Sequence, residues 1–115
     1  MEESNSALEE EKAKLEERIR FLEAKILDQK KGLGYTRKAL EEQYEELYEL
    51  ERNGPAAGLE FAWNSSVMGT KQKISHYEED KQTMTSRIKE YSGELDSCKE
   101  RLKEITVLIA DSTVR

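Results

Sequence analysis

Apolar residues recur along this chain at alternating intervals of four and three positions, which is the spacing of a coiled-coil heptad. The first series runs from Leu8 to Leu50 and the second from Trp63 to Ile109, so the pattern occupies both halves of the chain. Each series predicts one long helix with a narrow apolar seam. We expect the first helix over about residues 6–52 and the second over about residues 61–110.

The predicted interaction seam consists of apolar members of the two series. They are Leu8, Leu15, Ile19, Leu22, Ile26, Leu33, Leu40, Leu47, Leu50, Val67, Ile74, Tyr77, Met84, Ile88, Tyr91, Leu95, Leu102, Ile105 and Ile109. Other positions of the series hold Gln29, Thr36, Gln43, Thr70, Lys81 and Cys98. Further apolar residues lie outside the seams, and a wide apolar stripe favours a second interface.

Asn53-Gly54-Pro55 separates the two series and is a strong signal for the end of a helix. Glycine can take the left-handed conformation that closes a helix, and proline cannot continue one. We predict a connector over about residues 53–60, which extends to about residue 66 if Asn64-Ser65-Ser66 caps the second helix. Two arms of similar length on either side of a turn predict a single coiled-coil domain over residues 1–115.

Local signals set the expected ends and the weakest point of the helices. Ser6 followed by Glu9 fits a capping box, so the first helix is expected to begin near Ser6. The residues Asp111–Thr113 are expected to fray. Gly32 and Gly34 each cost a helix interior about 1 kcal/mol relative to alanine. The heptad register continues across both glycines, which favours one helix with a soft or bent spot over a turn.

The expected fold is all-α: an antiparallel coiled-coil helical hairpin, with association into a dimeric helical bundle as its extension. The rival is a parallel homodimer, which isoleucine at a positions and leucine at d positions favours. In a parallel dimer of the first helix, however, Lys25 would meet Lys30 of the second copy, and Glu46 would meet Glu51. These like charges favour the hairpin.

Two registers of the hairpin differ by one heptad. The preferred register sets Leu47 opposite Trp63 and Gln29 opposite Lys81. This register is preferred because it places two polar residues in one layer. An unpaired buried polar group would cost about 1 to 3 kcal/mol. The alternative register sets Lys81 opposite Thr36. The ion pairs expected in the preferred register are Arg18–Glu94, Glu11–Arg101, Lys30–Glu78 and Glu9–Lys99.

The composition agrees with a polar surface around a narrow seam, since 36% of the 115 residues are hydrophobic and 38% are charged. With a net charge of −6 and no basic cluster longer than Lys30-Lys31, the chain is not predicted to bind nucleic acid or an anionic membrane. Membrane insertion is not predicted either, because no stretch has the roughly 20 apolar residues of a membrane span. Met1-Glu2-Glu3 lacks the order of a signal peptide, so we expect an intracellular, cytoplasmic location, with attachment to the cytoskeleton as a variant.

Residues that could carry chemistry do not cluster in the sequence. His76 is the only histidine and has no serine or cysteine at a spacing that suggests a catalytic triad. Cys98 is the only cysteine and falls in the seam, where a small apolar role is expected. The pair Glu41-Glu42 and similar pairs lack the Glu-x-x-His pattern of di-iron bundles. We therefore expect no enzyme activity, catalytic site, cofactor or metal.

The expected function is that of a structural or assembly protein, which scaffolds or tethers partners in an intracellular complex through its heptad seams. Its partners would be proteins: a second copy, another coiled-coil protein or the subunits of a hetero-complex. One alternative is a holding chaperone, because two coiled-coil arms around a short insert resemble prefoldin subunits in layout. A second alternative is an adaptor with an aromatic recognition tip at Phe61 and Trp63.

Overall fold

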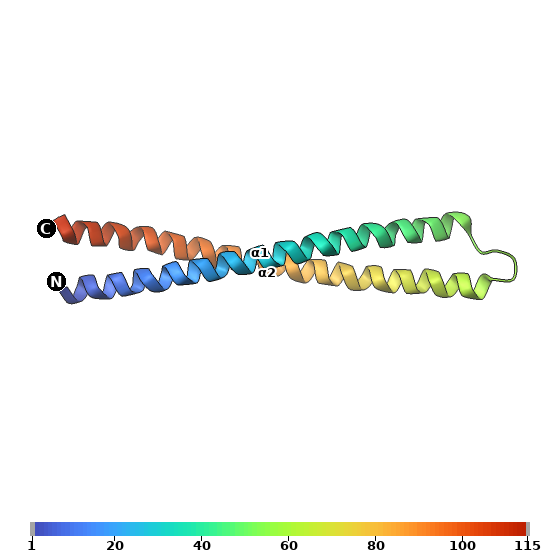
Figure 1. The fold of residues 1–115 in the computed structure, drawn as a ribbon, viewed down its shortest axis with the longest axis horizontal. Helices are drawn as coiled ribbons and strands as arrows, with labels where there is room; N and C mark the ends of the chain where they lie inside the picture. Colours follow the sequence, from blue (N-terminus) through green and yellow to red (C-terminus); the bar gives the residue numbers. More distant parts are fainter. Residues whose placement is uncertain (1, 115) are drawn as a thin grey trace. The chain divides into compact units, whose positions relative to one another are not determined.

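The computed structural model describes residues 2–114, and the side chains of residues 5–112. These residues form two α-helices, α1 over Glu2–Asn53 and α2 over Glu60–Val114 (Figure 1). Residues 54–59 connect them, and the described residues contain no strand. The chain is therefore an all-α helical hairpin, as its heptad pattern predicted.

The chain divides into two compact units, each with one segment of each helix. The unit that we call the terminal unit combines Met1–Asp28 with Arg87–Arg115. The turn unit is the continuous segment Gln29–Ser86, which includes the connector. Within each unit, a segment of α1 lies antiparallel to a segment of α2 (Figure 1).

Every buried side chain among the described residues belongs to one of the two heptad series. In the terminal unit these are Ile19, Leu22, Ile26 and Ile105, of which Leu22 and Ile105 are fully buried. In the turn unit they are Leu33, Thr36, Leu40, Val67, Thr70 and Ile74. Full burial of a leucine or isoleucine side chain contributes about 1.5 to 3 kcal/mol. The seam is thus the hydrophobic core of each unit.

Two ion pairs connect the helices of the terminal unit. The Arg18 guanidinium donates to the Glu94 carboxylate from Nε at 2.8 Å and from Nη2 at 3.0 Å. Arg101 donates to Glu11 from Nε at 2.9 Å and from Nη2 at 3.2 Å. Both pairs were predicted and are confirmed. Because arginine and glutamate side chains reach far along a helix axis, these pairs alone do not separate the two registers.

In the turn unit, the contacts of Met84 fit the alternative register and not the preferred one. The Thr36 hydroxyl lies 3.9 Å from the Met84 sulfur, and a β-carbon added to Gly32 would lie 3.2 Å from the same sulfur. The preferred register sets Thr36 opposite Ile74, which is about 15 Å of helix away from Met84. The alternative sets Thr36 opposite Lys81, within one helical turn of Met84, and accounts for both contacts.

The preferred register was wrong because it overestimated the cost of Lys81 in the seam. Gln29 and Lys81 were assigned to one layer so that neither would be buried without a polar partner. Lys81 is only partly buried, and a lysine can lay its alkyl chain along an apolar surface while its amine stays in water. With Met84 beside Gly32 and Thr36, the expected layer of Gln29 with Lys81 is not formed. The expected layer of Leu47 with Trp63 stays a prediction, since the Trp63 indole donates to Leu50, one helical turn from Leu47.

Two of the four predicted interhelical ion pairs are likewise not formed. Glu78, which was expected beside Lys30, instead accepts a hydrogen bond of 3.1 Å from the Tyr44 hydroxyl. Glu9 and Lys99 form no ion pair in the described part of the chain. Exposed pairs of this kind contribute only about 0.2 to 1 kcal/mol, so the packing of the seam decides the register against them.

The connector ends α1 and begins α2 within residues 54–59. Gly54 has a φ of 65°, and its N–H donates to the Leu50 carbonyl at 3.1 Å, which closes α1 in the left-handed manner predicted for this glycine. The Leu59 carbonyl accepts the first hydrogen bond of α2 from Trp63 at 2.9 Å. The second helix thus begins before Val67. The short connector has no place for the β-hairpins found in prefoldin subunits.

Both helices are longer at the chain ends than the local signals suggested. α1 begins at Glu2, so Ser6 lies inside the helix and the predicted capping box is wrong. α2 continues through Asp111–Thr113 to Val114, where fraying was expected. Because helical residues precede Ser6, α1 does not need a cap at this position. α1 also passes through Gly32 and Gly34 without a break.

Truncating the core should destabilise the fold far more than truncating its surface. Leu22→Ala empties a fully buried position and should lower the free energy of unfolding by about 2 to 5 kcal/mol. Leu27→Ala is the matched control, because Leu27 lies on the same helix and is 54% exposed; its effect should stay within about 0.5 kcal/mol. Urea unfolding followed by circular dichroism measures both. Equal effects would contradict this assignment of the core.

The two central glycines should respond differently to alanine. A β-carbon at Gly34 meets no atom within 4 Å, so Gly34→Ala should raise the free energy of unfolding by about 1 kcal/mol. A β-carbon at Gly32 lies 3.2 Å from the Met84 sulfur, so Gly32→Ala should gain less, because Met84 must shift. Thermal unfolding compares the two variants. A larger gain from Gly32→Ala would argue against the packing of Met84 described above.

Candidate functional site

The predicted seam residues all lie inside the helix pairs, since each is buried or partly buried and none is exposed. The partly buried members are Leu8, Leu15, Leu47, Leu50, Tyr77, Met84, Ile88, Tyr91, Leu95, Leu102 and Ile109. In each unit the apolar stripe of α1 is covered by α2 of the same chain. The eight fully or nearly fully buried members are therefore closed to a partner, and the partly buried ones present only their edges.

The two aromatic residues of the predicted tip have different surroundings. Phe61 is 86% exposed, whereas Trp63 is partly buried and its indole Nε1 donates to the Leu50 carbonyl at 2.7 Å. Trp63 thereby joins the start of α2 to the end of α1. Phe61 lies two residues away on the same helix and so faces another direction. Of this pair, Phe61 is the one available to a partner.

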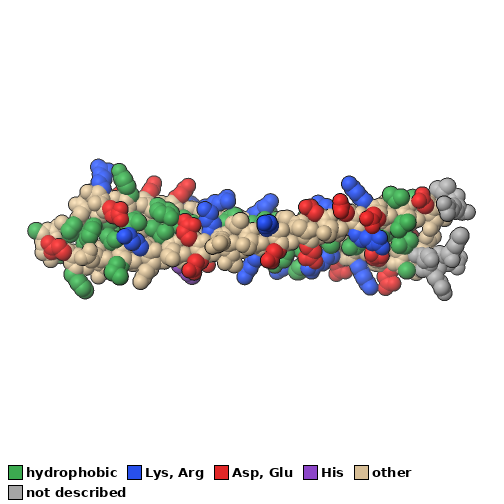
Figure 2. All heavy atoms as spheres, turned by 180° about the vertical axis from the view of Figure 1, so that it is seen from behind, with side chains coloured by type: hydrophobic (Ala, Val, Ile, Leu, Met, Phe, Trp, Pro, Cys, Tyr) green, Lys and Arg blue, Asp and Glu red, His purple; other side chains and the backbone are tan. Residues whose placement is uncertain are grey.

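Phe61 is part of a larger set of exposed apolar side chains in the turn unit. The others near the connector are Tyr44, Tyr48, Leu59 and Met68, with exposed fractions of 49%, 65%, 57% and 63%. Figure 2 shows hydrophobic side chains gathered at the connector end of this unit. Sequence reasoning missed Leu59 and Met68. Their signal was present, because Met68 follows Phe61 by seven residues and so shares its side of α2.

Electrostatic interactions shift the pKa of a few groups. The hydrogen bond that Tyr44 donates to the Glu78 carboxylate raises the pKa of Tyr44 above its usual value of 10.0. In the terminal unit, the hydrogen bond from Arg101 lowers the pKa of Glu11, and Glu11 in turn raises the pKa of Arg101. Each of these shifts has an interhelical contact as its main cause, so they describe helix pairing and not a reaction centre.

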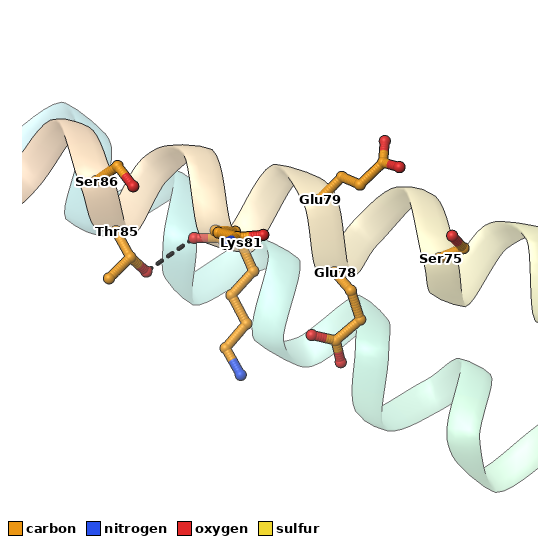
Figure 3. Close-up of a pocket in the computed structure, with 7 residues that line it drawn as sticks. Ser75, Glu78, Glu79, Lys81, Thr85 and Ser86 are labelled. Atoms are coloured by element: carbon orange, nitrogen blue, oxygen red, sulfur yellow. Dashed lines mark hydrogen bonds between the residues drawn. The ribbon is translucent and has the colours of Figure 1, made fainter.

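Figure 3 shows a shallow hollow on α2 of the turn unit, lined by side chains from Ser75 to Ser86. Its polar groups diverge: Glu79 and Ser75 point to one side of the helix, and Glu78 and Lys81 to the other (Figure 3). The dashed bond in the view is internal to the helix, from the Thr85 hydroxyl to the Lys81 carbonyl at 2.8 Å. This arrangement does not hold several reactive groups around one point.

Two other residues have side chains that can take part in catalysis or bind a metal, His76 and Cys98. His76 is 72% exposed and its Nε2 lies 3.6 Å from the Asp80 carboxylate, one helical turn away. Cys98 is a free, partly buried cysteine in the second seam. Among the described residues, no group of three or more His, Cys, Asp or Glu side chains is arranged to hold a metal ion.

No protein-family model, curated protein or solved structure matches this chain. None of its described helices combines the length and the apolar character needed to cross a membrane. Two features of the described residues bear on function. The seams are closed within the chain, and exposed apolar side chains gather beside the connector.

The Tyr44–Glu78 hydrogen bond should be visible in an alkaline titration. Because the pKa of Tyr44 is raised in the folded chain, its stabilising contribution is fully present below about pH 10 and is lost as the pH rises through the higher folded pKa. Labelled tyrosine ring carbons followed by NMR should give Tyr44 a pKa above 10.0, and Glu78→Gln should lower it. If the pKa of Tyr44 is the same in the Glu78→Gln variant, the hydrogen bond between Tyr44 and Glu78 does not form.

Proposed function

We propose that this chain is a non-enzymatic assembly protein, a helical hairpin that scaffolds or tethers protein partners. The observation that carries the proposal is the division of its apolar residues. The seam stabilises the hairpin itself, whereas a separate group beside the connector stays exposed, with Phe61 86% exposed. Large apolar side chains held on a rigid element are frequent anchors in protein interfaces.

In this mechanism the seam stabilises the hairpin, and the exposed apolar residues beside the connector contact the partner. Interlocking of α1 and α2 keeps the turn unit folded, and the Trp63–Leu50 hydrogen bond fixes the start of α2. Phe61 and Met68 are then presented on a helix that is ordered before the partner arrives. A partner loses little free energy to ordering when it binds such a preformed surface.

The partner chemistry follows from the charge of the residues that flank the connector in the sequence. Between residues 41 and 70 the chain has acidic side chains at positions 41, 42, 45, 46, 49, 51 and 60, and a single basic one, Arg52. An apolar contact on an acidic part of the chain suits a protein segment with apolar and basic side chains. We further propose an intracellular, cytoplasmic location, with the cytoskeleton as one setting for such a tether.

Phe61→Ala tests the proposal directly. The chain, immobilised and exposed to cytosol of the cells that produce it, should retain specific proteins, and Phe61→Ala should reduce that retention about tenfold or more, as expected for a truncated hot spot. Leu27→Ala, an exposed apolar residue of the terminal unit, is the control and should leave retention unchanged. Circular dichroism verifies that both variants fold.

Two results would contradict the proposal. One is the absence of any specifically retained protein, and the other is equal retention by the Phe61→Ala variant. An aggregation assay with a denatured client protein separates the chaperone alternative, because a holding chaperone suppresses the aggregation of unrelated clients. Suppression of that kind, together with no specific partner, would assign the chain to that class.

A further inference from the structure

The α1 segment of the turn unit carries a second heptad-spaced stripe beside the buried seam. Its members follow one another at intervals of four and three residues, and all are exposed: Lys30, Gly34, Arg37, Glu41, Tyr44 and Tyr48. Residues at this spacing lie along one side of a helix. Tyr44 connects the stripe to α2 through its hydrogen bond with Glu78.

Charge is segregated along this part of α1. Residues 29–40 contain Lys30, Lys31, Arg37 and Lys38 and no acidic residue. Residues 41–51 contain Glu41, Glu42, Glu45, Glu46, Glu49 and Glu51 and no basic residue. A helix that is basic in one half and acidic in the other is complementary to a second copy of itself, provided that the two copies run in opposite directions.

We infer that two copies of the chain associate antiparallel along this stripe, with a two-fold axis between Arg37 and Glu41. In this register Arg37 faces Glu41 of the second copy, and by symmetry Glu41 faces Arg37 of that copy. Gly34 faces Tyr44 of the second copy, and Lys30 faces Tyr48. The partner on this face is therefore another molecule of the same chain.

The side chains of the stripe fit this pairing in size as well as in charge. Nothing lies within 4 Å of a β-carbon placed on Gly34, so this position leaves room for a tyrosine ring. Tyr44 is 49% exposed while its hydroxyl is held by Glu78, which presents the ring in a fixed orientation. Lys30 opposite the exposed Tyr48 ring can form a cation–π contact.

The flanking charges also favour the antiparallel arrangement. Lys31 lies near Glu45 of the second copy, and this attractive contact occurs twice by symmetry. Lys38 meets its own counterpart at the axis, which is a single like-charge contact. In a parallel arrangement each block would instead face itself, with Arg37 near Arg37 and Glu41 near Glu41. Like charges directly opposed across an interface are unfavourable.

The dimer does not depend on the proposed function, because Phe61 is not part of the stripe. Sedimentation equilibrium of the full chain over a range of protein concentrations should show association from the 13.3 kDa monomer to twice that mass. Arg37→Glu and Glu41→Arg should each weaken the dimer about tenfold or more, because each replaces two attractive contacts with two repulsive ones.

The double variant Arg37→Glu with Glu41→Arg decides the register. It reverses both members of the facing pair, so it should restore the dimer to near the original affinity. Lys73→Glu is the control for a change of net charge, because Lys73 is exposed on α2 at a position outside the stripe; it should leave the dimer unchanged. Circular dichroism verifies the helical content of every variant.

Three outcomes would overturn the inference. The first is a chain that remains monomeric at all concentrations. The second is a dimer that neither single reversal weakens, which would place the interface elsewhere. The third is a double variant that stays as weak as the single ones, which would show that Arg37 and Glu41 do not face each other. Loss of partner binding in the Phe61→Ala variant with the dimer intact would separate the two proposals.

Discussion

The structure depends on the burial of one apolar stripe of α1 against one apolar stripe of α2. A chain with 38% charged residues has few apolar side chains, and a narrow seam between two helices can bury most of them. All buried side chains among the described residues come from the two heptad series. The rest of the surface is therefore free to be polar, and the few apolar residues left outside stand out as candidates for binding.

The seam also shows how an amphipathic polar residue is accommodated in a core of this kind. Lys81 occupies a heptad position but is only partly buried, because a pair of helices leaves the edge of every layer close to water. Thr36 contacts the Met84 sulfur, and Thr70 donates to the carbonyl of Ser66 at 2.9 Å. Thr70 is thus satisfied within its own helix, Thr36 contacts a sulfur across the seam, and the buried Gln43 Oε1 has no hydrogen-bond partner. Polar residues of the seam therefore do not pair with one another, which is why matching them across the helices did not identify the register.

The outer surface of the turn unit has two features that suit protein binding. Exposed apolar residues near the connector are suited to an anchor for another protein, and the charge blocks of α1 are suited to a second copy of the chain. The two surfaces share Tyr44 and Tyr48, whereas Phe61, Leu59 and Met68 lie outside the stripe, so partner binding at Phe61 and pairing along the stripe can be tested separately. The groups whose pKa values are shifted, Glu11, Tyr44 and Arg101, are members of interhelical contacts.

Periodicity identified the two helices and their buried face, because it shows which residues share a side of a helix. Glycine and proline identified the turn at Gly54, and opposite charges on facing helices identified the ion pairs of Arg18 and Arg101. The start of α1 was misplaced by a few residues, whereas that of α2 was predicted to within one residue. The register in the turn unit did not follow from the sequence, because registers one heptad apart present nearly equivalent apolar layers and differ in the side-chain packing of single residues such as Met84. The separation of Phe61 from Trp63 was also decided by packing: the indole finds a carbonyl at the end of α1, a contact that exists only after the chain has folded back. Local spacing determines faces, whereas contacts between distant segments determine how those faces are placed against each other.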